Sequence, residues 1–321
     1  MDRLNPAILE AFGAQRIIKK VKGYYICETQ GGFAKLHISS DPTHTINLQH
    51  AIKEHLAAEG FPFTDRYHLT KAGQPFLLMG RDNYVMTMYP QPQHETDFSC
   101  EDEVLQMVKA LALFHNAARN LALATAPVHL AATYTHMQSE LAQATKQARR
   151  TPRLSDFDVA FIKHMQYYNE IIEQCISSLT TTSYARLLSE ATAAGHLCHN
   201  AIKEENMPLT SEGVHIINFS QAANDLQLND LAAFIRRYAQ RSNKAIPISR
   251  ILEAYDHISP LPHGAVEILH TMLNFPWAFM KIVTQYYSKK RNWTPNGLLN
   301  RMDAILAERE SYEQYVSELQ F

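Results

Sequence analysis

The chain has 321 residues, of which 46% are apolar and 19% charged, and this composition excludes a largely disordered protein. Such a length suffices for two packed units. The net charge of −2 excludes the strongly basic balance typical of nucleic-acid binding, although residues 146–153 form a local basic patch, so no nucleic-acid partner is expected. Only 11 glycines are few for a fold that binds phosphate through a glycine-rich loop.

The N-terminal segment MDRLNPAILEAFG is charged and contains a proline, and no later apolar run approaches the ~18 residues of a membrane span. We therefore expect no signal peptide, no membrane partner and synthesis in the cytoplasm. His196, Cys198 and His199 lie close together, but further ligands at zinc spacing are missing, so no metal is expected. No CxxC spacing occurs, which predicts reduced thiols at Cys27, Cys100, Cys175 and Cys198.

The first 90 residues are rich in short β-strand patterns. AQRIIKKV, YYICET and FAKLHI predict an antiparallel meander over residues 14–38, with a turn at Lys22 and Gly23. An apolar stripe predicts one helix over 46–59, and PFLLMG and NYVMTMY then predict two more strands. Two prolines in segment 88–92 predict a connector between a β-rich domain, 1–90, and a helical domain, 91–321.

Helical spacing of apolar residues dominates the second domain. Ser99 with Asp102, and Ser155 with Asp158, have the spacing of a capping box and predict two helix starts. Apolar stripes predict further helical segments over 104–118, 162–179, 184–194, 231–241, 249–257, 264–273, 277–289 and 298–318. The expected fold class is therefore α+β, with a small antiparallel sheet and a larger, mainly helical part.

A loop, a short strand pair and a helix start follow one another over residues 197–237. This segment contains His199, Asn206, a strand that ends Asn218-Phe219-Ser220, and Asp230-Leu231. Together with the small strand lobe and the proline connector, it resembles the two-lobed kinase-like fold of aminoglycoside phosphotransferases and choline kinases. Those enzymes carry a His-x-Asp-x-x-x-x-Asn loop and a strand that ends in Asp-Phe-Asp or a similar triplet.

The resemblance implies a role for each acid of that motif. The loop Asp takes the proton of the acceptor hydroxyl, and the loop Asn and the strand-end Asp hold magnesium. His199 and Asn206 keep their positions, but Ala201 occupies the catalytic Asp position, and Asn218 and Ser220 are neutral. No catalytic residue of the motif is therefore intact. Loss of the positioned base alone typically costs about two to four orders of magnitude in rate. Weak metal binding and no cofactor are expected, with ATP and magnesium as a doubtful alternative.

The resemblance also implies two cofactor-binding candidates, Lys35 and Asn206. Lys35 lies on the third strand, where the family has its phosphate-contacting lysine, although it also fits a solvated strand lysine. Strand alternation does not decide between these, because Lys35 and His37 share one face. Glu54 is the first candidate for its ion-pair partner, and Glu59 or no partner is the alternative.

The loop residues also have purely structural interpretations. His199 fits a buried histidine that packs in the core, and Asn206 fits a turn residue before Met207-Pro208. Asp230 fits the N-cap of the helix over 231–241.

A second resemblance extends over nearly the whole chain. Seven phrases are similar to the spore coat protein family of the CotS type, at residues 111–119, 157–168, 183–188, 197–200, 229–237, 251–261 and 273–293. Ala201, Asn218 and Ser220 depart from this family too. The resemblance implies a protein that is deposited in the bacterial spore coat and contacts other coat proteins.

Three functions are therefore open. The leading hypothesis is a pseudokinase, a kinase-like protein without phosphotransferase activity that serves as a structural or interaction component of the coat. The second is a weak small-molecule kinase that uses Glu204, Glu205 or Asp225 as its base. The third is a module that binds a nucleotide or another small ligand through Lys35 and Asn206. No oligomeric state follows from the sequence.

Overall fold

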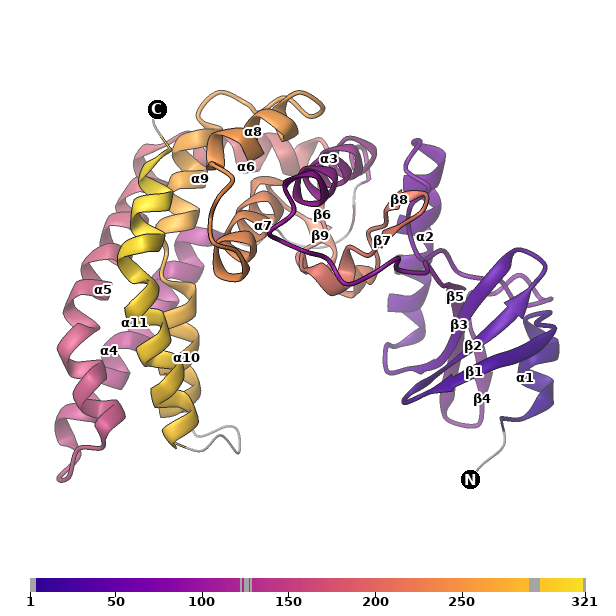
Figure 1. Cartoon of the computed structure of the whole chain (residues 1–321), viewed down its shortest axis with the longest axis horizontal. Helices are drawn as coiled ribbons and strands as arrows, with labels where there is room; N and C mark the ends of the chain where they lie inside the picture. Colours follow the sequence, from indigo (N-terminus) through magenta and orange to yellow (C-terminus); the bar gives the residue numbers. More distant parts are fainter. Residues whose placement is uncertain (1–3, 122, 124–126, 128, 289–294, 320–321) are drawn as a thin grey trace. The chain divides into compact units, whose positions relative to one another are not determined.

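The computed structural model describes residues 4–319 except 122, 124–126, 128 and 289–294 (Figure 1). The chain divides into two compact units. The first unit comprises Met1–Leu123, Ala194–Asn224 and His257–Ser259, and the second comprises Ala124–Ala193, Asp225–Asp256 and Pro260–Phe321. The expected domain boundary after residue 90 stays a prediction.

A five-stranded antiparallel sheet organises the first unit, in the order β1-β2-β3-β5-β4. Its strands are β1 Arg16–Val21, β2 Tyr24–Thr29, β3 Gly32–Ser39, β4 Leu77–Met79 and β5 Asp82–Met88. All five match predicted strands. Gly23 makes the predicted β1–β2 turn with φ +91°, a conformation that glycine adopts without the steric penalty of a side chain.

Two helices accompany this sheet, α1 Pro6–Ala11 and α2 Thr43–Ala58. Only α2 is predicted from the sequence, because six residues are too few for a visible apolar period. Ile8 of α1 and Phe12 beyond its end pack with Leu36 in one hydrophobic cluster. Side chains alternate along a strand, so Lys35 and His37 lie on the opposite face of β3 from this cluster.

The rest of the first unit consists of one long helix and several short elements. These are α3 Glu101–Ala117, β6 Leu197–Cys198, the 3₁₀ helix η1 Glu204–Asn206, β7 Leu209–Thr210, β8 Gly213–Val214, η2 Phe219–Gln221 and β9 Ala223–Asn224. The capping box predicted at Ser99 and Asp102 is wrong. Cys100 is the N-cap of α3, and the Ser99 hydroxyl donates to Asp97 at 2.7 Å, so it does not cap the helix.

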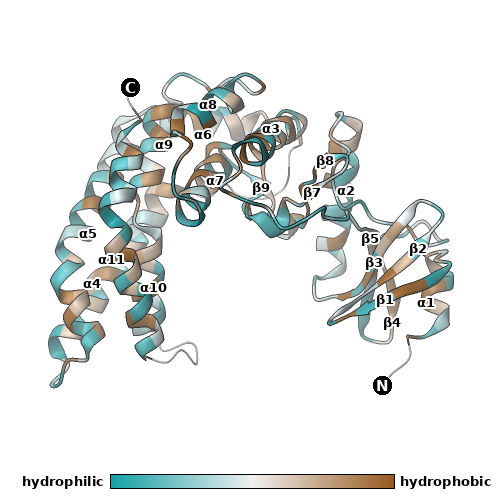
Figure 2. Cartoon of the chain, in the orientation of Figure 1, coloured by the Kyte–Doolittle hydropathy of each residue, from teal (hydrophilic) through white to brown (hydrophobic). Residues whose placement is uncertain are grey.

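The second unit is helical. Its elements are α4 Leu130–Arg150, α5 Asp156–Thr181, α6 Tyr184–Ala193, α7 Leu228–Arg241, α8 Ile248–Asp256, α9 Ala265–Asn274, α10 Trp277–Tyr287 and α11 Pro295–Ser317. The long helices α4, α5, α10 and α11 lie side by side (Figure 1). Hydrophilic and hydrophobic residues alternate along α4 and α5, as in amphipathic helices (Figure 2).

Aromatic side chains of α10 hold this bundle together. The Phe279 ring stacks on Tyr168 of α5 with centroids 3.8 Å apart, and the Tyr286 ring stacks on Phe157 at 3.9 Å. The interpretation of this aromatic segment as core packing is therefore confirmed for these residues. The predicted end of the helix at residue 289 lies outside the described residues.

Two features of the second unit differ from expectation. α4 has no predicted counterpart, because few apolar residues mark its packed face: its buried side chains are Leu130, Tyr134, Leu141, Ala144 and Ala148. The interpretation of Asp230 as an N-cap is wrong, since α7 begins at Leu228, with Gln227 as its N-cap, and Asp230 lies in the first turn.

The capping box at the start of α5 is confirmed and gives a stability prediction. The Ser155 hydroxyl accepts from the Asp158 backbone N–H, and the Asp158 carboxylate accepts from the Ser155 N–H. We expect Ser155→Ala to lower the free energy of unfolding by about 1–2 kcal/mol. Ser99→Ala, at the position that does not cap a helix, should cost less than about 0.5 kcal/mol. Urea denaturation measures both, and equal losses would contradict this assignment.

Candidate functional site

His199 lies fully buried between the loop and the aromatic core of the first unit. Its Nδ1 accepts from the Ala201 backbone N–H at 3.2 Å, so Nε2 carries the proton and donates to the Ile217 carbonyl at 2.8 Å. Its ring packs edge-to-face with Phe219, with centroids 5.0 Å apart. His199 is 0% exposed, so the structural interpretation is confirmed: the ring fixes the loop to the segment that follows β8.

Asn206 and Asn218 meet beside this histidine. Asn206 is buried at the end of η1 and donates from Nδ2 to the Ala201 carbonyl at 2.8 Å. Its Oδ1 accepts from Asn218 Nδ2 at 3.4 Å, and the Ser220 hydroxyl donates to Asn218 Oδ1 at 2.9 Å. The three polar side chains thus satisfy one another. Asn206 is not merely a turn residue.

The backbone at Asn218 keeps an unusual conformation. Its φ of +68° and ψ of 70° are left-handed, a region that Asn and Asp tolerate better than most residues with side chains. Asn218 therefore adopts a conformation that an Asp would also tolerate, but it lacks the negative charge; β8 ends earlier than the predicted strand, at Val214.

An acid outside the predicted site residues, Asp65, contacts the segment around Asn218. Asp65 lies between α2 and β4, and its Oδ1 accepts from the Asn218 backbone N–H at 3.4 Å. Close by, the Ile216 N–H donates to the Phe63 carbonyl at 2.8 Å. Residues 63–65 therefore lie along residues 216–218, within the first unit.

Asp65 is held by a buried lysine that was not among the candidates. Lys53 Nζ lies 2.8 Å from Asp65 Oδ1 and 2.9 Å from the Asp65 carbonyl, and 4.3 Å from the centre of the Tyr67 ring. The Lys53 side chain is 1% exposed and that of Asp65 17%. Because this ammonium group neutralises the carboxylate, Asp65 is poorly suited to attract a second cation.

A periodic signal in the sequence marks this lysine. Ile46, Gln49, Lys53 and Leu56 follow the three-four spacing of a buried helix face, and all four are buried in α2. Gln49 and Lys53 interrupt that apolar stripe. Gln49 in turn donates to Asp41 Oδ2 at 2.8 Å, so both interruptions are satisfied by acids.

The charges near β3 determine what the sheet can bind. Burial lowers the pKa of Lys53 from its usual 10.5, and Lys35 lowers it further, whereas Asp65 raises it. Burial and the neighbouring Lys35 lower the pKa of His37 to about 4. His37 is therefore neutral near pH 7 and does not offer a positive charge to a phosphate.

Lys35 itself is half-buried, and its ammonium lies 5.0 Å from the centre of the Tyr24 ring. Neither predicted partner pairs with it. Glu54 forms a bidentate pair with Arg66, on the exposed side of α2, and Glu59 follows the helix as its C-cap. The prediction of Glu54 as the partner of Lys35 is therefore wrong, because Arg66 binds both carboxylate oxygens of Glu54.

The side chains in this cluster do not fit a divalent cation well. Asn206 and Asn218 bond to each other, and Asp65 is neutralised by Lys53. Across the part of the chain that the structure describes, no three His, Cys, Asp or Glu side chains gather as metal ligands. A hard cation such as magnesium normally takes one or two free carboxylates.

The alternative bases are distributed over both units. Glu204 and Glu205 lie in η1, where Glu205 is exposed and 4.0 Å from Lys203 Nζ. Asp225 is 1% exposed in the second unit, and its carboxylate accepts from the Leu226 N–H at 2.7 Å. Their use as a base stays a prediction.

Comparison with protein families decides what kind of chain carries this cluster. Residues 13–319 match the family described as "Spore coat putative kinase YutH". The chain belongs to this family. The predicted resemblance to a spore coat family with a kinase-like fold is thereby confirmed, and the narrower CotS type stays a prediction. Curated proteins supply no match.

Solved structures similar to this YutH-family chain share its fold. An aminoglycoside phosphotransferase from Alicyclobacillus acidocaldarius has a TM-score of 0.86 at 17% identity, over 99% of this chain and 96% of that one. A choline/ethanolamine kinase family protein from Mesorhizobium loti has a TM-score of 0.53 at 12% identity, covering 98% and 95%. A choline kinase from Cryptosporidium parvum has a TM-score of 0.52 at 10% identity, over 94% of this chain and 90% of that one.

These similarities confirm the predicted α+β, kinase-like fold. At such low identity they carry no information about activity. The roles assigned to Lys35, Asn206, Ala201 and Ser220 stay predictions.

Proposed function

We propose that this YutH-family protein is a pseudokinase that serves as a structural or interaction component of the spore coat. It would be made in the cytoplasm, deposited in the coat and held there by contacts with other coat proteins. Within the described residues, no helix combines the length and apolar character of a membrane span. The family match supports the coat role, and the cluster around Asn218 supports the loss of phosphotransfer.

The observation that carries this proposal is the Lys53–Asp65 pair. Ala201 cannot accept a proton, and Asn218 and Ser220 carry no charge. Asp65 is the acid that touches this segment, and it is already neutralised at 2.8 Å by a buried ammonium. A phosphotransferase needs free carboxylates for the hydroxyl proton and for magnesium.

Thermal denaturation with ATP and magnesium tests this proposal. A ligand that binds only the native state at a hundred times its dissociation constant adds about 2.7 kcal/mol to the unfolding free energy. For a chain of this size such a gain corresponds to a rise of several degrees in Tm. We expect no shift in Tm and no ATP turnover.

The competing functions give different results in the same experiment. The half-buried Lys35 favours retained nucleotide binding, because an ammonium on this strand suits phosphate. A magnesium-dependent rise in Tm without ATP turnover, lost in Lys35→Ala, would indicate a binding module and would overturn the expected absence of nucleotide binding. The same rise in Tm with ATP turnover would indicate a weak phosphotransferase and would overturn the pseudokinase proposal.

A further inference from the structure

The turn between α4 and α5 carries a concentration of positive charge. Lys146, Arg149, Arg150 and Arg153 lie within eight residues that contain no acid, and all four side chains are exposed. None of the four forms an ion pair with an acid of the described residues, whereas some exposed cations elsewhere do, as in Arg186 with Glu190. We call these four residues the basic tip.

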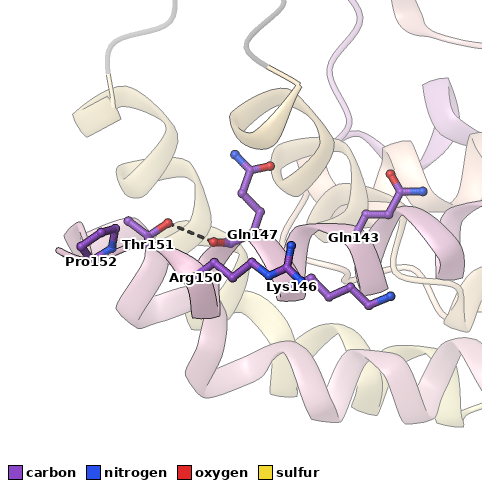
Figure 3. Close-up of a pocket in the computed structure, with 6 residues that line it drawn as sticks. All are labelled: Gln143, Lys146, Gln147, Arg150, Thr151 and Pro152. Atoms are coloured by element: carbon purple, nitrogen blue, oxygen red, sulfur yellow. Dashed lines mark hydrogen bonds between the residues drawn. The ribbon is translucent and has the colours of Figure 1, made fainter.

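A pocket lies along the face of α4 that leads to the basic tip. It has a volume of about 480 Å³, and six residues line it: Gln143, Lys146, Gln147, Arg150, Thr151 and Pro152. Figure 3 shows the side chains of Gln143, Lys146 and Arg150 along this helix. Their ammonium, guanidinium and amide groups are hydrogen-bond donors, and no carboxylate lines the pocket.

The helix dipole explains only part of this charge. Cations in the last turn of a helix stabilise its C-terminus by about 0.3–1 kcal/mol each, which accounts for Arg149 and Arg150. Arg153 lies beyond the end of α4, in the turn, where the dipole gives no reason for a cation. Lys146 lies a full turn before Arg150, and its side chain lines the pocket.

The backbone that presents these cations is fixed at both ends. The Thr151 hydroxyl donates to the Gln147 carbonyl at 3.0 Å (Figure 3) and closes α4. Ser155 caps α5 four residues later. A surface that is already ordered loses less entropy when it binds a partner.

Two exposed aliphatic side chains follow the basic tip in sequence, Leu154 directly after Arg153 and Val159 in the first turns of α5. Leu154 is 45% exposed and Val159 is 54% exposed. Asp156 is the exposed acid nearby, whereas Asp158 is buried and accepts from the Tyr287 hydroxyl at 2.8 Å. Cations next to apolar side chains suit a protein segment that combines carboxylates with an aliphatic residue.

We propose that the basic tip and its pocket bind an acidic, aliphatic-containing segment of another protein. Carboxylates would pair with the arginines and Lys146 and accept from the glutamine amides, and an aliphatic residue would cover Leu154 or Val159. A nucleic-acid strand fits less well, because four cations on a chain of net charge −2 give a short electrostatic footprint. The choice of a protein partner rests on the proposed role in the coat.

Fluorescence anisotropy of the full chain with three labelled probes tests this surface. The probes are a twelve-residue peptide of repeated Glu-Glu-Leu, the same length of Glu-Glu-Ser, and a twelve-nucleotide oligo-dT. We expect the Glu-Glu-Leu peptide to bind most tightly and to bind more weakly as salt rises. K146Q/R149Q/R150Q should weaken it at least about tenfold. Leu154→Ser should weaken Glu-Glu-Leu and leave Glu-Glu-Ser unchanged.

A matched variant separates local recognition from overall charge. K19Q/K20Q/K22Q also removes three positive charges, from exposed lysines on and after β1, and should leave peptide binding unchanged. Equal losses in both triple variants, no peptide binding, or tighter binding of oligo-dT would each overturn the proposal. Because the experiment contains neither ATP nor magnesium, its failure would leave the proposed absence of phosphotransfer untouched.

Discussion

Asp65→Asn is expected to lower the free energy of unfolding by about 2–4 kcal/mol, because it removes the charge that compensates a buried ammonium. Lys53 is 1% exposed and would keep the Asp65 carbonyl and the Tyr67 ring as its neighbours. Removing one partner of a buried ion pair typically costs about 3–5 kcal/mol. Asp65 is 17% exposed, so solvent relieves part of this cost and the expected loss is about 2–4 kcal/mol. Urea denaturation at neutral pH measures the loss.

Two further variants show whether the loss comes from the unpaired charge. Lys53→Met combined with Asp65→Asn replaces the pair by neutral groups and should recover most of the lost stability. Glu54 lies on α2, as Lys53 does, and pairs with Arg66 beyond the end of the helix. Glu54→Gln breaks this more exposed pair and should cost less than about 1 kcal/mol. A double variant as unstable as Asp65→Asn alone would show that the pair does not stabilise the first unit in this way.

The pH dependence of stability gives an independent test of Lys53. Burial lowers its folded pKa below the usual 10.5, while Asp65 raises it. Between the folded and the unfolded pKa, the unfolded chain binds more protons, so stability increases as pH rises through that window. Asp65→Asn removes the carboxylate that raises the folded pKa of Lys53. The pH range between the folded and the unfolded pKa therefore extends to lower pH in this variant. Its deficit relative to the natural protein should therefore shrink as the pH rises towards the usual lysine pKa of 10.5. A deficit that stays constant with pH would contradict a charged Lys53.

The sheet and the loop could be predicted because their signals are local. Alternating runs separated by turn residues identified all five strands, and the seven-residue interval from His199 to Asn206 identified the loop. Alternation on β3 left the face of Lys35 open, because either face of a strand can be the buried one. The structure resolves this through α1, which packs on the side of Leu36.

The Lys53–Asp65 pair could not be predicted in the same way. Its partners are twelve residues apart, across the end of a helix and a loop, so no fixed spacing connects them. A lysine on a buried helix face indicates only that some acid or hydrogen-bond acceptor must compensate its charge, and not which residue does so. α4 could not be predicted for a different reason. Two of its five buried positions are alanines, which add little to an apolar stripe at helical spacing.

Restoring the missing acids is expected to return phosphotransfer to this fold. Ala201→Asp supplies the proton acceptor, and Asn218→Asp supplies a metal-binding carboxylate in a backbone conformation, φ +68°, that Asp tolerates as well as Asn. Since a positioned base contributes about two to four orders of magnitude in rate, ATP-dependent turnover on a panel of sugars and amino alcohols should increase at least about 100-fold. Ala201→Asn with Asn218→Asp is the matched control, of similar size but without a proton acceptor.

Asn218→Asp alone should destabilise the protein in the absence of magnesium. Its new oxygen would face Asn206 Oδ1, now 3.4 Å from Asn218 Nδ2, and would add negative charge near Asp65. Loss of the hydrogen bond and like-charge repulsion should cost about 1–2 kcal/mol without magnesium. A divalent cation would relieve the repulsion, so magnesium should raise the Tm of this variant and leave the natural protein unchanged. If Asn218→Asp gains no magnesium-dependent stability, the single lost charge at residue 218 is not what abolishes metal binding, and the ion pair at Asp65 is the stronger obstacle.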